Sequence, residues 1–103
     1  MPMNNLVYLA PAVEDMEEIV KFHILNVGPT SARKVYEMME AAINRLADFP
    51  LLGQTHPDPV LAANGYRKLV LTQTYVAVYK VIGGTVYIYR VVNGKTDYPQ
   101  LLK

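Results

Sequence analysis

The stretch YRKLVLTQTYVAVYKVIGGTVYIYRVVN, residues 66–93, decides the fold. It contains three runs that are rich in β-branched and aromatic residues, a composition typical of strands. Gln73-Thr74 separates the first two runs and Gly83-Gly84 the last two, and a Gly-Gly pair strongly favours a two-residue hairpin turn. The sequence therefore predicts three consecutive antiparallel strands towards the C-terminal end.

The residues before this stretch predict a further strand and a first helix. Residues 5–10 (NLVYLA) form a short apolar run that we interpret as a strand. Ala10-Pro11 can open a helix, because proline in the first turn loses no hydrogen bond it could have made. Apolar residues then recur at spacings of three and four from Met16 to Val27, and Gly28-Pro29 ends the helix.

A second helix is predicted immediately afterwards. Thr30 or Ser31 can cap it, and its apolar stripe runs from Val35 to Leu46. Because only about three residues join the two helices, we expect an antiparallel helical hairpin. Residues 50–65 contain three prolines and two glycines and are predicted to be a loop. The order β-α-α-β-β-β predicts one α+β domain over residues 1–103, with the helical hairpin packed on a small antiparallel sheet.

Both faces of this predicted sheet are apolar. With two-residue turns, one face collects a set of large apolar side chains framed by Arg67, Lys80 and Asn93: Leu69, Leu71, Val76, Val78, Tyr87 and Tyr89. The other face collects mostly smaller ones, suited to packing against helices: Val70, Ala77, Val81, Val86, Ile88 and Val92. Two helices cover only one face, and soluble monomers rarely expose large apolar patches. We predict that the first face binds a partner chain; the alternative is that the 50–65 loop and the C-terminal tail cover it.

Charge is distributed unevenly along the chain. Residues 1–66 carry eight acids against four bases, whereas residues 67–103 carry six bases against Asp97 alone. The basic end is a candidate surface for an anionic partner. The alternative is that the acidic helices neutralise a basic sheet within one molecule.

Several classes of protein are excluded. The chain has no cysteine, which rules out thiolate catalysis and disulfides, and its two histidines, His23 and His56, make a dedicated metal site improbable. No phosphate-binding glycine motif or common hydrolase motif is present, so no cofactor is predicted. No apolar run approaches the roughly 20 residues that span a bilayer.

Polar residues gather at the end of the last predicted strand. Arg67, Lys80, Arg90 and Lys95 could hold phosphates, and Asn93 or Tyr98 could orient a nucleophile. For Arg90 the alternative is an ion pair with an acid of the first helix, namely Glu14, Glu17 or Glu18.

Three segments, together with the order β-α-α-β-β-β, resemble the RelE/ParE family of type II toxin–antitoxin toxins: APAVEDMEEI (10–19), LADFPLLG (46–53) and YRKLVLTQTYVAVYKVIGGTVYIYRVVNGKTDYPQLL (66–102). The resemblance extends from about Leu6 to Leu102. It implies a cytoplasmic toxin that inhibits growth and stabilises plasmids, held inactive in a hetero-oligomer by a small antitoxin lying along its sheet and helices. ParE-like members inhibit DNA gyrase, and RelE-like members cleave mRNA on the ribosome.

The sequence departs from the nuclease pattern of that family. Val76 stands where the nucleases usually carry an arginine, Leu69 where they carry a lysine, and Asn93 where they carry a histidine. An asparagine cannot act as a general base at neutral pH. The resemblance therefore favours a ParE-like inhibitor. The alternatives are a RelE-like ribosome-dependent endoribonuclease with Arg67, Arg90, Asn93, Lys95 and Tyr98 around the scissile phosphate, and an inactive binding module of the same fold.

Overall fold

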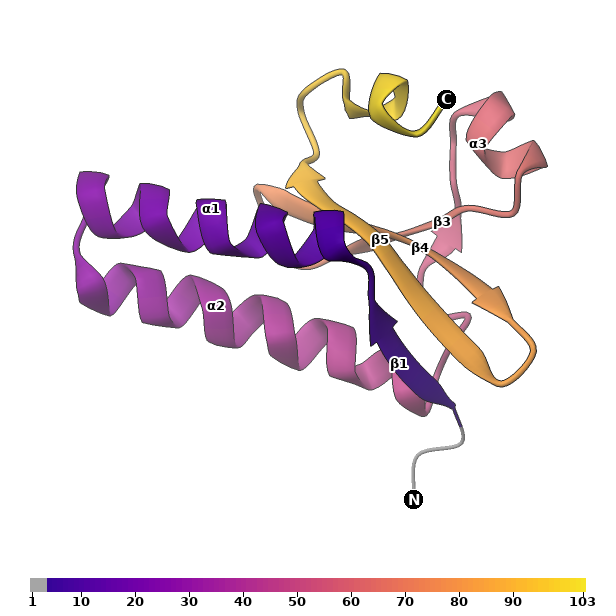
Figure 1. Ribbon diagram of the computed structural model, residues 1–103, viewed down its shortest axis with the longest axis horizontal. Coiled ribbons are helices and arrows are strands. Elements are labelled where there is room, and N and C mark those ends of the chain that lie inside the picture. Colours follow the sequence, from indigo (N-terminus) through magenta and orange to yellow (C-terminus); the bar gives the residue numbers. More distant parts are fainter. Residues whose placement is uncertain (1–3) are drawn as a thin grey trace.

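The structure, a computed structural model, describes residues 4–103, whose elements are shown in Figure 1. The first half contains β1 (Asn5–Tyr8), α1 (Ala10–Asn26), α2 (Pro29–Asn44) and a 3-10 turn, η1 (Arg45–Ala47). The second half contains β2 (Gln54–Thr55), α3 (Pro59–Ala63), β3 (Arg67–Val70), β4 (Tyr75–Ile82), β5 (Thr85–Asn93) and a 3-10 segment, η2 (Tyr98–Leu102). Within residues 4–103, no helix has the length and apolarity needed to cross a membrane.

The predicted α+β class is confirmed, with one difference in the sheet. Five strands lie in the order β1-β5-β4-β3-β2. The β3–β4 and β4–β5 pairs are antiparallel as predicted, but β1 pairs with β5 in parallel, so the sheet is mixed. Parallel pairing is open to β1 because two long helices, rather than a tight turn, connect it to the other strands.

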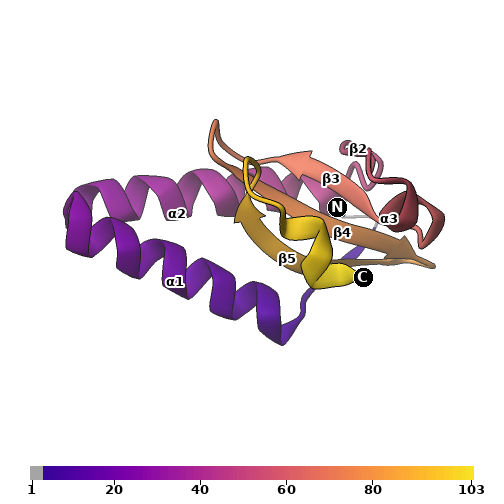
Figure 2. The same cartoon turned by 90° about the horizontal axis from the view of Figure 1, so that it is seen from above.

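The helical hairpin covers one face of the sheet, as Figures 1 and 2 show. The core between them is completely apolar apart from one tyrosine hydroxyl: Ala12, Met16, Ile19, Met39, Ile43, Leu46, Leu69, Leu71, Ala77, Tyr79, Val86, Ile88 and Val91. The predicted cap of α2 is wrong. Gly28, with φ of 135°, occupies the N-cap position and no side chain caps the helix. Pro29, the first residue of the helix, has no N–H and so removes one of the backbone donors that lack a partner within the helix.

The turn between β3 and β4 is one residue longer than predicted. Leu71 N–H bonds the carbonyl of Tyr75, and three residues, 72–74, form the loop. The hydroxyl of Thr72 accepts the N–H groups of Thr74 and Tyr75 at 3.1 and 3.0 Å, which stabilises this longer turn. A one-residue shift moves a whole strand to the opposite face. Leu69 and Leu71 are therefore buried under the helices, and their predicted place on an open face is wrong.

The turn between β4 and β5 is the two-residue Gly83-Gly84 turn that the sequence predicts, with Ile82 opposite Thr85. Further along, the register shifts: Tyr79 pairs with Ile88 but Val78 pairs with Arg90, which leaves Tyr89 as the extra residue of a β-bulge. Beyond the bulge the faces of β5 are exchanged relative to the prediction. Val91 enters the core under the helices and Val92 lies on the other face.

The other face is half covered by the chain itself, so the prediction that all of it is open is wrong. A second cluster comprises Leu61, Tyr66, Val76, Val78, Val92 and Tyr98, with Tyr89 and Leu102 against it. Leu61 belongs to α3 and Tyr98 to η2, so the 50–65 segment and the tail form the cover that the sequence left as the alternative. Val76 and Val78 are buried beneath them, whereas Tyr87 and Tyr89 stay half-buried.

The helical hairpin extends beyond the sheet, to the left in Figure 1. Its tip therefore has no strand to pack against. Phe22, Leu25 and Val27 keep 55%, 73% and 67% of their surface exposed. Exposed side chains of this size forgo about 1.5–3 kcal/mol each relative to burial. Exposed apolar side chains therefore lie on the hairpin as well as on the sheet, where Val7 and Ile82 are exposed.

Candidate functional site

Arg90 is held by the first helix. Its guanidinium donates two hydrogen bonds, of 2.7 and 2.8 Å, to the two carboxylate oxygens of Asp15. The same carboxylate accepts the N–H of Val91, next to the bulge, at 3.0 Å. The hydrogen bonds that Arg90 donates to Asp15 raise the pKa of Arg90 against the opposing effect of burial. The predicted ion pair with the first helix is therefore present, but its partner is Asp15 rather than Glu14, Glu17 or Glu18.

Arg67 also has structural partners. One of its terminal nitrogens donates to the carbonyls of Leu51 and Gly53, and the other reaches the hydroxyl of Thr55. Its Nε is buried without a hydrogen-bond partner in the described chain. These contacts fasten the segment that follows η1 to the start of β3.

Asn93, Lys95 and Tyr98 lie beyond the bulge and have separate surroundings. The side chain of Asn93 accepts the N–H of Lys95 at 2.9 Å and so shapes the turn after β5, whereas the Lys95 side chain is exposed. Tyr98 is buried and its hydroxyl lies 2.8 Å from Nε2 of His56. Burial raises the pKa of Tyr98, and Asp58 adds to the increase. Among the described residues, no hydrogen bond or ion pair links these five candidates except the one between Asn93 and Lys95.

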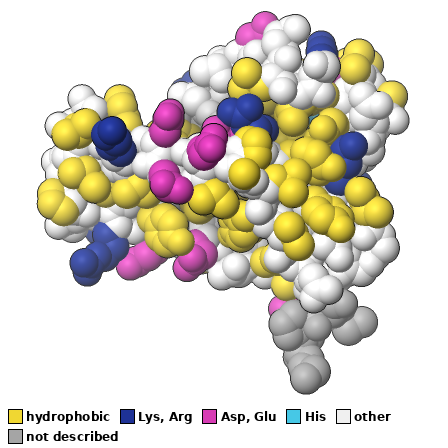
Figure 3. Space-filling view, in the orientation of Figure 1, with side chains coloured by type: hydrophobic (Ala, Val, Ile, Leu, Met, Phe, Trp, Pro, Cys, Tyr) yellow, Lys and Arg dark blue, Asp and Glu magenta, His cyan; other side chains and the backbone are white. Residues whose placement is uncertain are grey.

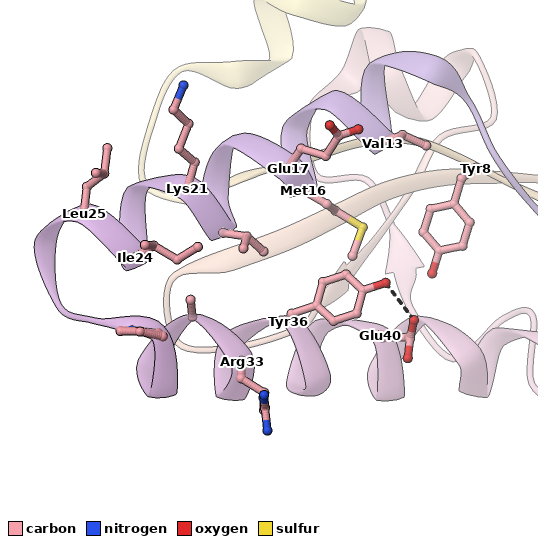
Figure 4. Close-up of a pocket in the computed structure, with 13 residues that line it drawn as sticks. Tyr8, Val13, Met16, Glu17, Lys21, Ile24, Leu25, Arg33, Tyr36 and Glu40 are labelled. Carbon is pink, nitrogen blue, oxygen red and sulfur yellow. Dashed lines mark hydrogen bonds between the residues drawn. The ribbon is translucent and has the colours of Figure 1, made fainter.

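A groove of about 860 Å³ lies between α1 and α2. Its lining is mostly apolar: Tyr8, Val13, Met16, Val20, Ile24, Leu25, Pro29, Ala32 and Tyr36. Figure 4 shows Met16 and Tyr36 directed towards each other across the space between the helices. Met16 is buried at its base, while Ile24 and Leu25 remain exposed towards the hairpin tip. A groove of this shape and polarity suits an apolar polypeptide segment.

Charged groups lie at the rim of this groove and differ between its ends. Glu17 and Glu40 lie towards β1, and Lys21 and Arg33 lie towards the hairpin tip, with both basic side chains directed away from the space (Figure 4). Tyr36 donates a hydrogen bond of 2.9 Å to Glu40, which raises the pKa of Tyr36. Burial, assisted by Glu40, raises the pKa of Tyr8 to about 12. The tyrosines of the groove are therefore neutral hydrogen-bonding groups at neutral pH.

β1 is an edge strand of the sheet. It lies beside the groove, since Tyr8 of β1 is one of the residues that line it. Its partner on one side is β5, and no strand of residues 4–103 pairs with its other edge. An edge strand presents unpaired backbone groups to which a further strand can add. Groove and edge together offer one continuous surface for an extended or helical partner segment.

Sequence reasoning missed this groove, although a signal for it was present. The apolar residues of α1 do not form one narrow stripe. Ala12, Met16 and Ile19 are buried against the sheet, while Val13, Val20 and Ile24 line the groove. An apolar arc of this width on one helix indicates two separate contacts.

The six residues predicted to bind a partner chain are not an exposed set. Leu69 and Leu71 are in the core under the helices, Val76 and Val78 lie beneath α3 and η2, and Tyr87 and Tyr89 alone of this set retain partial exposure. The longer β3–β4 turn and the cover formed by the chain's own segments account for the difference.

The shape of the chain is shared with solved toxin–antitoxin structures. A chain of the chromosomal ParDE system from P. aeruginosa is 24% identical over 88% of this chain and 96% of that chain, with a TM-score of 0.76. A chain of the RelBE2 toxin–antitoxin complex from Mycobacterium tuberculosis is 23% identical over 90% and 99%, with a TM-score of 0.60. The YoeB/ParE toxin from Agrobacterium tumefaciens is 20% identical over 86% and 96%, with a TM-score of 0.59. At these identities the likeness establishes the fold.

A search of curated proteins gave no match to the sequence. The family comparison is decisive, because residues 6–98 match the family described as ParE toxin of type II toxin–antitoxin system, parDE. That match runs from the second residue of β1 to the start of η2, and it includes β2 to β5, both long helices and the residues that line the groove. The chain belongs to the ParE toxin family of type II toxin–antitoxin systems.

Proposed function

We propose that this toxin is a ParE-like inhibitor of an essential process, such as DNA gyrase activity, and that a cognate antitoxin neutralises it by seating an apolar segment in the α1–α2 groove. The observation that carries the proposal is the groove itself, an apolar space of about 860 Å³ on a hairpin that overhangs its sheet. A partner that buried Ile24 and Leu25 there would gain about 1.5–3 kcal/mol for each large side chain.

Inhibition without RNA cleavage is favoured by the surroundings of the candidate catalytic residues. Arg67 is bonded to backbone carbonyls, Arg90 to Asp15 and Tyr98 to His56. A nuclease needs such groups free and aimed at one phosphate. RelE-like cleavage and an inactive module are retained as outcomes of the test.

The first experiment is inducible expression in a bacterial host, followed by measurement of growth, of gyrase supercoiling activity in lysate and of mRNA cleavage. We expect growth arrest with loss of supercoiling and intact mRNA. Cleaved mRNA with normal supercoiling would replace this proposal by the nuclease, and undisturbed growth would indicate an inactive module.

The second experiment tests the groove by co-expressing the toxin with the product of an adjacent small reading frame. We expect Ile24→Glu to retain toxicity but to escape neutralisation, because a carboxylate in the apolar groove would need to be desolvated when the partner binds. Val60→Glu on α3, an equally exposed apolar position outside the groove, is the matched control and should stay neutralised. Equal neutralisation of both variants would place the antitoxin elsewhere.

A further inference from the structure

The face of the sheet turned away from the helices is exposed to solvent near the β4–β5 turn. Leu6 and Tyr8 pack into the core under the helices, so Val7 between them points to the other side. In register, Val7 lies beside Tyr87 and Tyr87 beside Lys80, on three adjacent strands. Val7 is 37% exposed, and Ile82 at the end of β4 is 56% exposed. We call this surface, formed by Val7, Lys80, Ile82, Tyr87 and Tyr89, the sheet strip.

Lys80 is fixed within the sheet strip by two aromatic rings. Its Nζ lies 4.3 Å from the ring centroid of Tyr66 and 5.2 Å from that of Tyr89. The two rings meet edge to face with centroids 5.0 Å apart and planes at 85°. Tyr66 is buried in the second cluster and Tyr89 packs against that cluster, so the two rings hold the Lys80 ammonium in a fixed position. An ammonium held in this way has less rotamer freedom to lose when it binds an anion.

The charge of this surface has one sign. The sequences of β1, β3, β4 and β5 contain no aspartate or glutamate. Lys68 lies opposite Val78 and so belongs to the same face of the sheet. Neither Lys68 nor Lys80 has an ion pair within residues 4–103, in contrast to Lys103, which pairs with Asp58. In Figure 3 the acidic side chains are seen mainly over the helices, while apolar and basic atoms occupy the region of the sheet.

We propose that the sheet strip is a docking surface for an acidic segment of a partner protein, with a carboxylate of that segment bound at Lys80 and apolar side chains placed on Val7, Ile82 and Tyr87. An apolar and aromatic centre with a fixed charge is the composition of an interface hot spot. This surface is separate from the α1–α2 groove and does not depend on which partner occupies the groove or on the target of the toxin.

An acidic polypeptide fits this surface better than a single-stranded nucleic acid. Binding of single strands relies on bases stacking on free aromatic faces. Here the ammonium of Lys80 already lies over the rings of Tyr66 and Tyr89, and stacking would have to displace it. A carboxylate can approach Lys80 without disturbing either ring.

The test uses a fluorescein-labelled peptide of about ten residues that alternates Glu and Leu, so that one edge of an extended chain is acidic. Its binding to the full chain is measured by fluorescence anisotropy, with a Lys-Leu peptide and an oligo(dT) of similar length as competitors of different chemistry. We expect Lys80→Gln to weaken binding of the Glu-Leu peptide by about fivefold or more, because the fixed charge is lost. Lys34→Gln, which removes the same charge from an exposed position on α2, should change it by less than about twofold.

Three outcomes would overturn the proposal. Equal weakening by both substitutions would mean that only net charge matters, and unchanged binding after Lys80→Gln would place the peptide elsewhere. Equal or tighter binding of the Lys-Leu peptide or of oligo(dT) would show a general apolar surface or a nucleic-acid site. NMR shifts of the Lys80 and Tyr87 amides on titration, together with unchanged thermal unfolding of both variants, exclude a loss of binding through misfolding.

Discussion

A single tyrosine hydroxyl organises the segment between η1 and β2. Tyr79 is fully buried, donates a hydrogen bond to the carbonyl of Pro50 at 2.8 Å and accepts the N–H of Gly53 at 3.0 Å. Arg67 bonds the carbonyl of the same glycine. The sequence predicts a break after Phe49-Pro50, but it does not show which side chains fasten the segment. The identity of a residue does not reveal which carbonyls will surround it, so the sequence could not show that Arg67 bonds the backbone of this segment.

Gly53 offers a prediction at this scale. A Cβ on Gly53 would lie 2.5 Å from the carbonyl oxygen of Lys68 and 2.8 Å from the hydroxyl of Tyr79, so alanine must displace strand backbone. We expect Gly53→Ala to lower the free energy of unfolding by about 1–3 kcal/mol, measured by urea denaturation. Gly84→Ala is the control, because a Cβ there has nothing within 4 Å. Equal urea midpoints for the two variants would contradict this account.

At the scale of elements, the bulge of β5 and the first turns of α1 depend on each other. Asp15 accepts three hydrogen bonds, two from Arg90 and one from the backbone of Val91. The sequence could predict that an acid of α1 would meet Arg90, because the predicted register places Arg90 on the side of the sheet facing the helices. In the structure Arg90 lies opposite Val78, a residue of the other face, and its guanidinium still reaches Asp15. The sequence could not predict the bulge, because nothing in YIYRVV marks Tyr89 as the extra residue, and one unpaired residue exchanges the faces of everything after it.

Asp15→Ala is expected to destabilise the protein by about 2 kcal/mol, since it leaves a half-buried guanidinium and a backbone N–H without their acceptor. Urea denaturation measures the loss. Glu18→Ala, an exposed acid on the same helix, serves as the control and should change stability by less than about 0.5 kcal/mol. If the two variants unfold at the same urea concentration, the Asp15 carboxylate contributes nothing beyond its charge.

The cover formed by α3 and η2 is expected to respond to pH. His56 is buried, its Nδ1 accepts the N–H of Asp58 at 3.0 Å, and its Nε2 lies 2.8 Å from Tyr98. A ring nitrogen that accepts a backbone N–H carries no proton, so Nε2 donates to Tyr98 and the ring is neutral. Burial lowers the pKa of His56 from 6.5 and the charge of Lys68 lowers it further, while Asp58, which is paired with Lys103, opposes them.

The unfolded chain therefore takes up a proton on His56 at a higher pH than the folded chain does. The stability that this neutral histidine provides is complete above about pH 6.5 and decreases as the pH falls from there towards the lower pKa of the folded state. When the pH is lowered from about 7.5 to about 5.5, the free energy of unfolding should decrease for the wild type and for His23→Gln. The decrease should be smaller for His56→Gln. An equal decline in all three would remove His56 from the explanation.

At the scale of the whole molecule, the strand pattern predicts an exposed apolar surface, and the structure places only part of it on the predicted face of the sheet. The composition and the strand pattern show that two helices cannot cover both apolar faces of the sheet. They also predict the α+β class, the helical hairpin and the Gly83-Gly84 turn. The part of the exposed surface on the hairpin follows from the direction of the helices, since the tip of α1 and α2 extends past the sheet in Figure 1. The sequence could not show that α3 and η2 fold back over the other face, because their contacts join residues more than thirty positions apart.

This overhang predicts two rates of amide hydrogen exchange within one helix. Amides of α1 near Ala12 to Ile19, which are backed by the sheet, should exchange more slowly than those of residues 21–27 at the tip, because buried contacts oppose local opening. Hydrogen exchange followed by mass spectrometry measures the difference. Binding of an antitoxin in the groove should slow exchange at the tip and leave the sheet unchanged; protection confined to the strands would indicate a different contact.

The parallel pairing of β1 with β5 also governs when the molecule can form during synthesis. Asn5 meets Thr85 across a span of eighty residues, so the first strand to leave the ribosome waits for one of the last. Translation proceeds at about 5–20 residues per second, which leaves α1 without its sheet for several seconds. Contacts so distant along the chain also slow folding itself. The sheet of a nascent chain therefore cannot be completed until residues 85–93 have emerged from the ribosome, and until then α1 lacks the apolar surface on which it packs.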